Sequence, residues 1–269
     1  METTNGMRAI KNLFGFPLQD EQKGQKFLIG SLVFLSGIFI PVIPRIALWG
    51  YAARIMKNSI EGNPPRLPEW DRWDILLADG LRLSVAGLLL NLPAVLLYFL
   101  GIGTYLGGFL GTVVAQETAG NELAGPFVLL LFGSMGVMFL SISAATLLSI
   151  AGWFLIPPVS AHVAATGRFS AIFDVKGWGK VLSANLGGFV LVCFTMFGLW
   201  AVGYLIFYLI YMTFVLCVFL PIILAPFTVY LVAVSAEMAG QSYREAREKL
   251  GQTAGGEPAV VVEGAGVDL

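Results

Sequence analysis

The feature that most constrains this chain is a set of long apolar runs. A membrane-spanning helix needs about 20 consecutive apolar residues. Only 12% of the chain is charged and 57% is hydrophobic, whereas soluble domains carry about 25% charged residues. We therefore expect an all-α, polytopic bundle of transmembrane helices with interfacial amphipathic helices, built from five or six hydrophobic segments. Five apolar stretches are visible: Phe27–Trp49, Leu81–Ala115, Ala124–Ile156, Leu182–Ile210 and Tyr211–Met238.

Prolines and glycines interrupt or end several of these stretches, including the fifth, which contains Pro221 and Pro226. The first contains Pro41 and Pro44, the second contains Pro93 and a glycine pair at 101 and 103, and the third is predicted to stop at Pro157-Pro158. The second and third stretches each exceed 30 residues. Each is therefore a tilted helix, a helix that continues into water, or a crossing plus a half-span.

Composition along the chain predicts three regions. Residues 1–26 form an N-terminal cytoplasmic segment, residues 27–250 a single transmembrane helical domain, and residues 251–269 a Gly-rich disordered tail. Aromatic residues beside charges predict interfacial helices near 51–80 and 166–180, the first with a helix starting at Pro68. The end of the last helix, 241–250, is predicted to continue into water.

Basic loops predict the orientation, because Lys and Arg are retained in the cytoplasm. The acidic 116–123 loop is expected outside, and the 158–181 loop and the C-terminus inside, so the last two stretches form a hairpin. Residues 1–26 and 50–80 are both basic, which conflicts with a single crossing between them. Either the first stretch is re-entrant and bends at Pro41–Pro44, which we favour, or the second stretch crosses twice, turning near Gly101–Gly103.

Small residues recur every four positions on two stretches and predict helix-packing faces. Such faces pack helices within one chain or form a homo-oligomer interface, and both readings remain open. The predicted faces are Gly103, Gly107 and Gly111 on the second stretch and Ser141, Ala145 and Ser149 on the third.

Polar groups at membrane depth are few. Asn91, Asn185 and Glu237 are the candidates, the asparagines for interhelical hydrogen bonds or a cavity lining, and the glutamate for a functional site or an interfacial contact. His162 is the only histidine, and no common catalytic, phosphate-binding or metal-binding motif is present. We therefore expect neither an enzyme of a common class nor a cofactor. The nearly neutral chain also predicts no nucleic-acid partner.

One segment resembles a known family. Gly50-Tyr51-x-x-Arg54, then Leu67-Pro68-Glu69-Trp70-Asp71 and Asp79-Gly80-Leu81, are similar to the family of domain of unknown function 4013. The likeness extends from about Gly24 to Tyr243. It implies a multi-pass membrane protein of the prokaryotic plasma membrane and transfers no activity or catalytic residue.

The residues of this segment have a physical reading of their own. They predict anchoring at the lipid headgroups, with arginines that bind anionic phosphates or bridge to Glu69 and Asp71. The predicted interfacial residues are Tyr51, Arg54, Trp70, Arg72 and Trp73.

Two functions fit these features. The first is a non-enzymatic scaffold, assembly factor or accessory subunit of a membrane complex, with membrane lipids, other membrane proteins or further copies of itself as partners. The alternative is a small-solute transporter or channel with a midplane site between broken helices.

Overall fold

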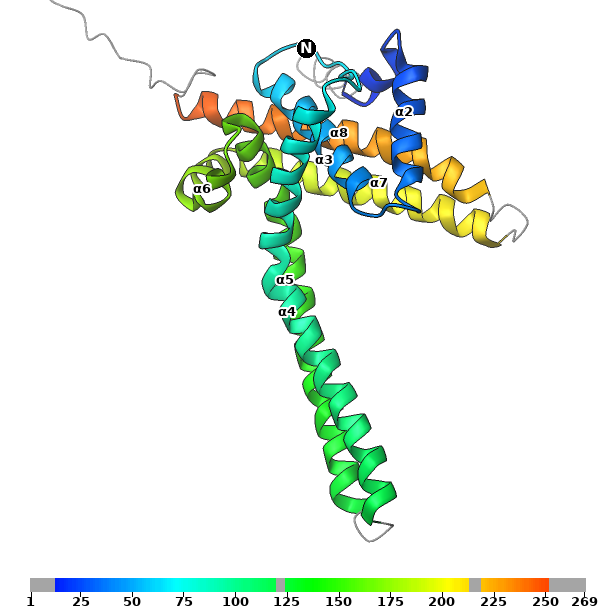
Figure 1. Cartoon of the computed structure of the whole chain (residues 1–269). Coiled ribbons are helices and arrows are strands. Elements are labelled where there is room, and N and C mark those ends of the chain that lie inside the picture. The colour runs from blue at the N-terminus through cyan, green and yellow to red at the C-terminus, as the bar shows by residue number, and fades with distance from the viewer. Residues whose placement is uncertain (1–12, 120–123, 213–218, 252–269) are drawn as a thin grey trace, which may run out of the picture. The chain divides into compact units, whose positions relative to one another are not determined.

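The computed structural model describes residues 13–119, 124–212 and 219–251, and every regular element among them is helical. This confirms the predicted all-α class. The chain divides into two compact units, residues 1–86 with 157–269 and residues 87–156. The elements are α2 (Lys23–Ser36), α3 (Ile43–Ile60), α4 (Trp73–Ala119), α5 (Ala124–Thr166), the 3₁₀ helix η2 (Phe169–Phe173), α6 (Val175–Ala184), α7 (Leu186–Met212) and α8 (Leu220–Lys249). Figure 1 labels all of them except η2.

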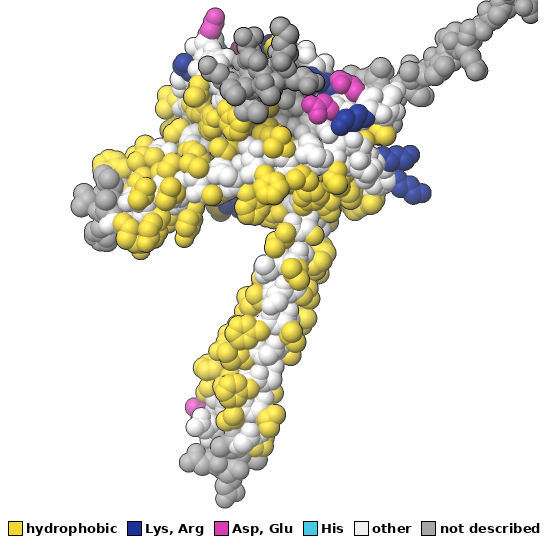
Figure 2. Space-filling model, turned by 180° about the vertical axis from the view of Figure 1, so that it is seen from behind, with side chains coloured by type: hydrophobic (Ala, Val, Ile, Leu, Met, Phe, Trp, Pro, Cys, Tyr) yellow, Lys and Arg dark blue, Asp and Glu magenta, His cyan; other side chains and the backbone are white. Residues whose placement is uncertain are grey.

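Four helices, α4, α5, α7 and α8, are long and apolar enough to cross a membrane, with mean hydropathy between 1.8 and 2.2 in their most apolar windows. Most side chains in those windows of α4, α5 and α7 are exposed on the protein. Figure 2 shows hydrophobic side chains covering the long helical surfaces, with few charged groups among them. Such surfaces are stable when lipid replaces water around them.

Helix α4 runs unbroken through Pro93 and through Gly101 and Gly103. The prediction that the second stretch turns near Gly101–Gly103 and crosses twice is therefore wrong. The apolar residues on both sides continue the helix, and one missing backbone N–H at Pro93 does not end it. Residues 120–123, the centre of the predicted outer loop, lie outside the described residues, as does the predicted tail from 252.

Helix α5 also continues past its prolines, so the predicted stop at Pro157-Pro158 is wrong. Both prolines are buried, and Val159, Ala161 and Val163 beyond them are at most 1% exposed. Burial of this last part of the helix outweighs the hydrogen bonds that the two proline rings remove. The helix ends at Thr166, before Gly167 with its positive φ of 64°.

The first apolar stretch is split, as its prolines predict. Helix α2 ends at Ser36, residues 37–42 form turns, and α3 begins at Ile43 with Pro44 in its first turn. The chain reverses here, so that α2 and α3 form a hairpin of two short helices (Figure 1). Neither helix is among those long and apolar enough to span a membrane.

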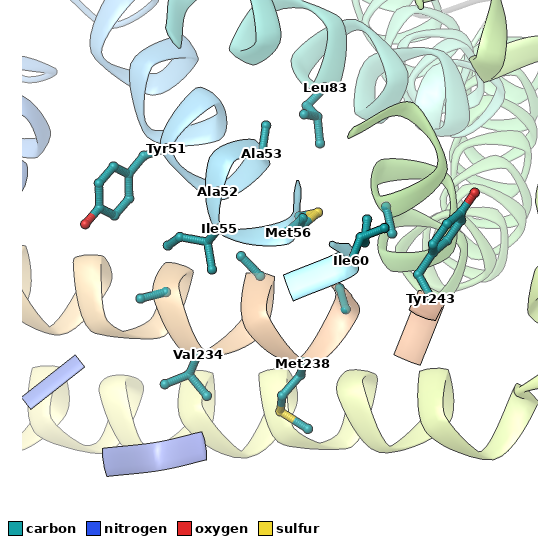
Figure 3. Close-up of a cluster of buried hydrophobic side chains, with 14 of the residues drawn as sticks. Tyr51, Ala52, Ala53, Ile55, Met56, Ile60, Leu83, Val234, Met238 and Tyr243 are labelled. Atoms are coloured by element: carbon teal, nitrogen blue, oxygen red, sulfur yellow. The ribbon is translucent and has the colours of Figure 1, made fainter. Parts of the chain in front are cut away.

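Helix α8 is the centre of the larger unit. It packs against α2, α3, α6 and α7. In Figure 3, Ile55 of α3 points toward α8, and Val234 and Met238 point from α8 toward α7. Helices α7 and α8 lie side by side, as a hairpin of the last two stretches requires. The end of α8 differs from its prediction, since Tyr243 and Ala246 are buried by protein rather than extended into water.

The smaller unit consists of two helical segments, 87–119 of α4 and 124–156 of α5. They touch where small residues meet. A Cβ atom on Gly101 would lie 2.9 Å from Ser141 Cβ, and one on Gly108 would lie 2.3 Å from Ser134 Oγ. Tyr98 and Thr146 share a hydrogen bond of 3.1 Å. Close backbone approach thus packs these segments together.

Candidate functional site

The residues that resemble the family gather where α3 crosses the start of α4. Two glycines make this crossing possible. A Cβ atom on Gly50 would lie 1.8 Å from the carbonyl oxygen of Leu76, and one on Gly80 would lie 1.9 Å from that of Ile46. Any side chain at either position would collide with the backbone of the other helix. Gly50 and Gly80 therefore fix how closely α3 and α4 pack.

An aromatic stack lies beside this crossing. The ring of Tyr51 is stacked on that of Trp70, with centroids 4.2 Å apart and planes 3° from parallel. Trp70 Nε1 donates a hydrogen bond to the carbonyl oxygen of Lys26 at the start of α2. Tyr51 is fully buried and Trp70 is 9% exposed. The two rings therefore join α3, the 61–72 loop and α2, and they face protein rather than lipid headgroups.

Arg54 holds the end of the 61–72 loop. Its Nη1 donates to the carbonyl oxygen of Glu69 at 3.0 Å and to Asp71 Oδ1 at 2.7 Å, and its Nη2 donates to the carbonyl oxygen of Arg72 at 3.0 Å. The planar guanidinium suits this three-acceptor arrangement. Arg54 thus bridges to Asp71, one of the two roles that the sequence left open.

The same contacts explain where α4 begins. The helix starts at Trp73 rather than at Pro68, which corrects the sequence prediction. Arg72 has a φ of 47°, a left-handed conformation that non-glycine residues adopt at a cost of about 1–2 kcal/mol. The backbone before Trp73 is held out of helical geometry by Arg54. The Arg72 side chain is exposed, and Trp73 is partly exposed with its ring 5.9 Å from that of Trp70.

A partly buried ion pair lies near Trp70. Lys26 Nζ contacts Asp20 Oδ2 and the carbonyl oxygen of Leu67, each at 2.8 Å. Burial tends to raise the pKa of Asp20, but hydrogen bonds from Lys26 and Gln22 and the lysine charge together lower it below its ordinary value. Burial, with a contribution from Asp20, raises the pKa of Tyr51. The tyrosine is therefore neutral at physiological pH.

A pocket of about 540 Å³ opens between α3 and the 61–72 loop, beside Lys26 and Arg54. Arg54, Lys26 and Asp71 in its wall are already paired. Lys57 and Arg66 make no ion pair among the described residues, so their charges are available to a ligand. The full lining is Lys26, Arg54, Lys57, Asn58, Glu61, Asn63, Arg66, Leu67, Pro68, Glu69 and Asp71.

The chemistry of this pocket is recognition by charge. Its wall carries cations and carboxylates together, so it suits a partner that presents both signs or a polar peptide surface. No group of three potential metal-binding side chains occurs in the described part of the chain.

Glu237 is buried at the interface of α3 and α8, 1% exposed. Ser59 Oγ and Gln241 Nε2 both donate to its Oε1 at 2.9 Å. Its Oε2 has no hydrogen-bond partner among the described residues. The structure thus places this glutamate inside the protein, between α3 and α8. Gly240 lets the helices approach here, since its Cβ atom would lie 2.7 Å from the carbonyl oxygen of Met56.

His162 joins a polar chain that the sequence did not predict. Its Nδ1 lies 2.9 Å from the Tyr243 hydroxyl and its Nε2 lies 3.4 Å from Asp174 Oδ2. Asp174 also caps α6, because its Oδ1 accepts from Gly177 N. These contacts connect the end of α5, the start of α6 and the end of α8. No sequence motif indicates them, because the three residues lie far apart along the chain.

The side-chain amide nitrogens of both asparagines are hydrogen-bonded within the protein. Asn185 donates to the carbonyl oxygen of Ser242 and to Glu245, and it accepts from Lys249. Asn91 donates to the carbonyl oxygen of Gly87 in its own helix. They belong to different units.

The predicted small-residue faces are partly used within the smaller unit. Ser141 and Ala145 are buried and Ser149 is half-buried. Gly103 and Gly107 face open space, and Gly111 meets only Leu130. The close contacts belong instead to Gly101 and Gly108, which share a helix face seven residues apart and were missed as a pair.

Comparison with known proteins agrees with the motif. A family model described as "Protein of unknown function (DUF4013)" matches residues 33–212, which include α3, the 61–72 loop and the α3–α4 crossing. No curated protein and no solved structure matches the chain. Because the match covers most of the 269 residues, the chain belongs to the DUF4013 family, as the residues around Tyr51 and Trp70 predicted.

Proposed function

We propose that this protein is a four-crossing integral membrane protein that acts without catalysis, as a scaffold, assembly factor or accessory subunit of a membrane complex. One observation carries the proposal: the family-specific residues serve as structural supports. Gly50 and Gly80 set a helix crossing, Tyr51 and Trp70 stack, and Arg54 fixes a loop. An enzyme's distinctive residues normally converge on a free reactive group. Here they produce a fixed surface.

The long apolar helices support a membrane location. Large apolar side chains on these helices are exposed by about two thirds or more: 72% for Phe99, 65% for Phe132, 74% for Leu140 and 72% for Phe194. Lipid is the solvent that such side chains prefer. With four crossings and inward-facing basic segments, both termini lie on the cytoplasmic side of a prokaryotic plasma membrane.

The docking surface that we assign to this function is the pocket between α3 and the 61–72 loop. Lys57 and Arg66 provide unpaired cations, and Glu61 and Glu69 provide carboxylates on the same wall. The clamp by Arg54 gives the loop one conformation before a partner arrives. A preformed charged surface of this kind favours specific protein contact, because little ordering is lost on binding. The partner is another membrane protein or a second copy of this chain.

The transporter alternative receives less support. It expects polar groups left free to line a midplane cavity. The amide nitrogens of Asn91 and Asn185 instead donate to partners within the protein, and the two residues belong to different units.

The test is purification of the full-length protein from its native membrane in mild detergent, followed by native mass spectrometry. We expect a defined complex heavier than the single chain. Lys57→Glu with Arg66→Glu should dissociate it, whereas the charge-preserving pair Lys57→Arg with Arg66→Lys should retain it. Recovery of the wild-type protein only as an isolated chain would refute the proposed function. An intact complex after charge reversal would refute the pocket as its docking surface.

A further inference from the structure

The segment between α5 and α7 carries exposed apolar rings outside the four span-capable helices. Phe169 and Phe173 of η2 are 48% and 64% exposed, and Val175 at the start of α6 is 60% exposed. The two phenylalanine rings contact each other edge-on, with centroids 6.4 Å apart. Clustered exposed rings of this kind normally have a binding partner.

Three basic residues lie close to these phenylalanines in the sequence. Arg168, Lys176 and Lys180 are exposed, and none makes an ion pair within the described parts of the chain. Lys176 and Lys180 are four residues apart on α6 and therefore lie on one face. The only nearby acid of this segment, Asp174, is already engaged by His162 and by the start of α6. We call the six residues Arg168, Phe169, Phe173, Val175, Lys176 and Lys180 the aromatic–basic surface.

The aromatic–basic surface is held in place from behind. Ala171 and Ile172 are buried between the two exposed phenylalanines. Trp178 Nε1 donates to the carbonyl oxygen of Ile172, and Val181 on the opposite face of α6 is buried. The buried residues behind the two rings therefore hold them in an exposed position. A surface fixed in this way suits a permanent contact.

The position of the segment indicates what covers it. A single residue, Asn185, separates α6 from α7, and α7 exposes Leu186, Leu191 and Phe194 from its first turns onward. The aromatic–basic surface therefore lies at one end of a helix that can cross a bilayer. Rings beside lysines at such a position match the headgroup region, where rings enter the acyl boundary and cations stay at the phosphates.

We propose that the aromatic–basic surface binds the anionic lipid headgroups of the leaflet at the start of α7. This inference rests on the proposed membrane location and adds the lipid class and the residues that bind it. A second copy of the chain is a poor occupant, because this segment carries three positive charges against the single negative charge of Asp174, and two copies would repel each other. Anionic phosphates neutralise the positive charges, and each Lys or Arg near such a surface strengthens binding about fivefold.

The test uses full-length protein in which Cys193 and Cys217 are replaced by Ser and Ser170→Cys carries an environment-sensitive fluorophore. Ser170 is exposed between the two phenylalanines, so both rings remain. The protein is reconstituted in phosphatidylglycerol vesicles and in phosphatidylcholine vesicles, some with a spin label near the headgroup. We expect blue-shifted emission and at least twofold stronger quenching in phosphatidylglycerol.

Charge variants make the test specific. Lys176→Glu with Lys180→Glu should abolish the difference between the two lipids, whereas Lys176→Arg with Lys180→Arg should keep it. Phe169→Ser with Phe173→Ser should shift emission toward that of water. Equal, water-like emission in both lipids would overturn the inference, and so would a blue shift that appears only when several copies share one vesicle.

A separate measurement distinguishes failure of this inference from failure of the proposed membrane location. Retention of each protein in the vesicles is checked by flotation after alkaline extraction. Loss of the wild-type protein at this step would refute the membrane location itself. Retention with a water-like fluorophore would refute only the lipid contact of the aromatic–basic surface.

Discussion

Arg54 is the residue on which the conformation of the 61–72 loop most depends. Its guanidinium reaches Glu69, Asp71 and Arg72 at once, an arrangement that one ammonium group cannot reproduce. Its side chain is 17% exposed and that of Asp71 is 56% exposed. Solvent therefore weakens the ionic part of the contact, and the two backbone acceptors give the rest of its strength.

We expect Arg54→Ala to lower the free energy of unfolding by about 1–2 kcal/mol, between the contribution of an ordinary hydrogen bond and that of a hydrogen bond to a charged group. Arg54→Lys should recover less than half of the loss. The measurement is the melting temperature in detergent, followed by tryptophan fluorescence, because Trp70 and Trp73 adjoin the loop. Arg66→Lys, at an exposed position, is the matched control and should melt like the wild type. If Arg54→Lys had the same melting temperature as the wild type, the three-acceptor contact of the Arg54 guanidinium would not be what stabilises the loop.

Asp20 gives a prediction on pH. Its pKa in the folded protein is lowered, despite burial, by Lys26 and by the Gln22 N–H. A lowered folded pKa stabilises the protein above the ordinary value of 3.8, and that contribution disappears as pH falls through the folded value. Asp20→Asn should therefore reduce the melting temperature at pH 7. The difference from wild type should shrink below pH about 4.

The control for this titration is Lys26→Met, which removes the main partner of Asp20. In that background, Asp20→Asn should have a smaller effect at pH 7 than it has alone. A difference between Asp20→Asn and wild type that stays constant from pH 7 to pH 3 would show that the carboxylate is not the group responsible.

At the scale of elements, the sequence predicts helices better than it predicts their ends. Apolar runs identified α4, α5, α7 and α8, and Pro41 with Pro44 located the turn after α2. The ends were missed where tertiary contacts decide them. Burial of residues 157–163 carries α5 past two prolines, and Arg54 delays α4 to Trp73. Neither cause is visible in a local window of sequence.

The candidate site was predicted in its residues but not in its geometry. The motif indicated Tyr51, Arg54 and Trp70, and aromatic residues beside charges suggested that they face lipid headgroups. The structure buries both rings, because they stack on each other and α2, distant in the sequence, packs against Trp70. A hydrophobic pattern shows that a side chain avoids water, and it does not distinguish lipid from protein as the shelter.

The crossing of α3 and α4 provides a prediction at this scale. Gly50→Ala and Gly80→Ala should each destabilise the protein by more than about 3 kcal/mol, because the new methyl group would meet backbone rather than a movable side chain. Gly87→Ala on α4 is the matched control, since nothing lies within 4 Å of its Cβ position. It should stabilise the helix by about 0.5–1 kcal/mol. Yield and melting temperature in detergent measure all three.

Comparing these glycine variants distinguishes the effect of close helix packing from the effect of alanine's higher helix propensity. If Gly50→Ala and Gly87→Ala changed the melting temperature in the same direction, the close approach of α3 and α4 would not be a determinant of stability. A Gly80→Ser variant should behave like Gly80→Ala, since the collision involves the Cβ atom itself.

At the scale of the whole molecule, the number of span-capable helices resolves a conflict in the charge pattern. Residues 1–26 and 50–80 are both basic, and both are expected in the cytoplasm. Among the described residues, the hairpin of α2 and α3 contains no helix long and apolar enough to span a membrane, so in the proposed topology the chain returns to the side from which it came. With the four crossings that we propose, both termini, residues 50–72 and the aromatic–basic surface would all lie on one side.

This topology predicts which positions a membrane-impermeant maleimide reaches in intact cells. In a background with Cys193→Ser and Cys217→Ser, Glu117→Cys near the end of α4 should be labelled from outside. Glu21→Cys before α2 and Ser170→Cys in η2 should be labelled only after the membrane is opened. All three positions are exposed on the protein, so a lack of labelling reports the membrane and not burial. Labelling of Glu21→Cys in intact cells, with Ser170→Cys still protected, would place a crossing within the α2–α3 hairpin and refute the four-crossing arrangement.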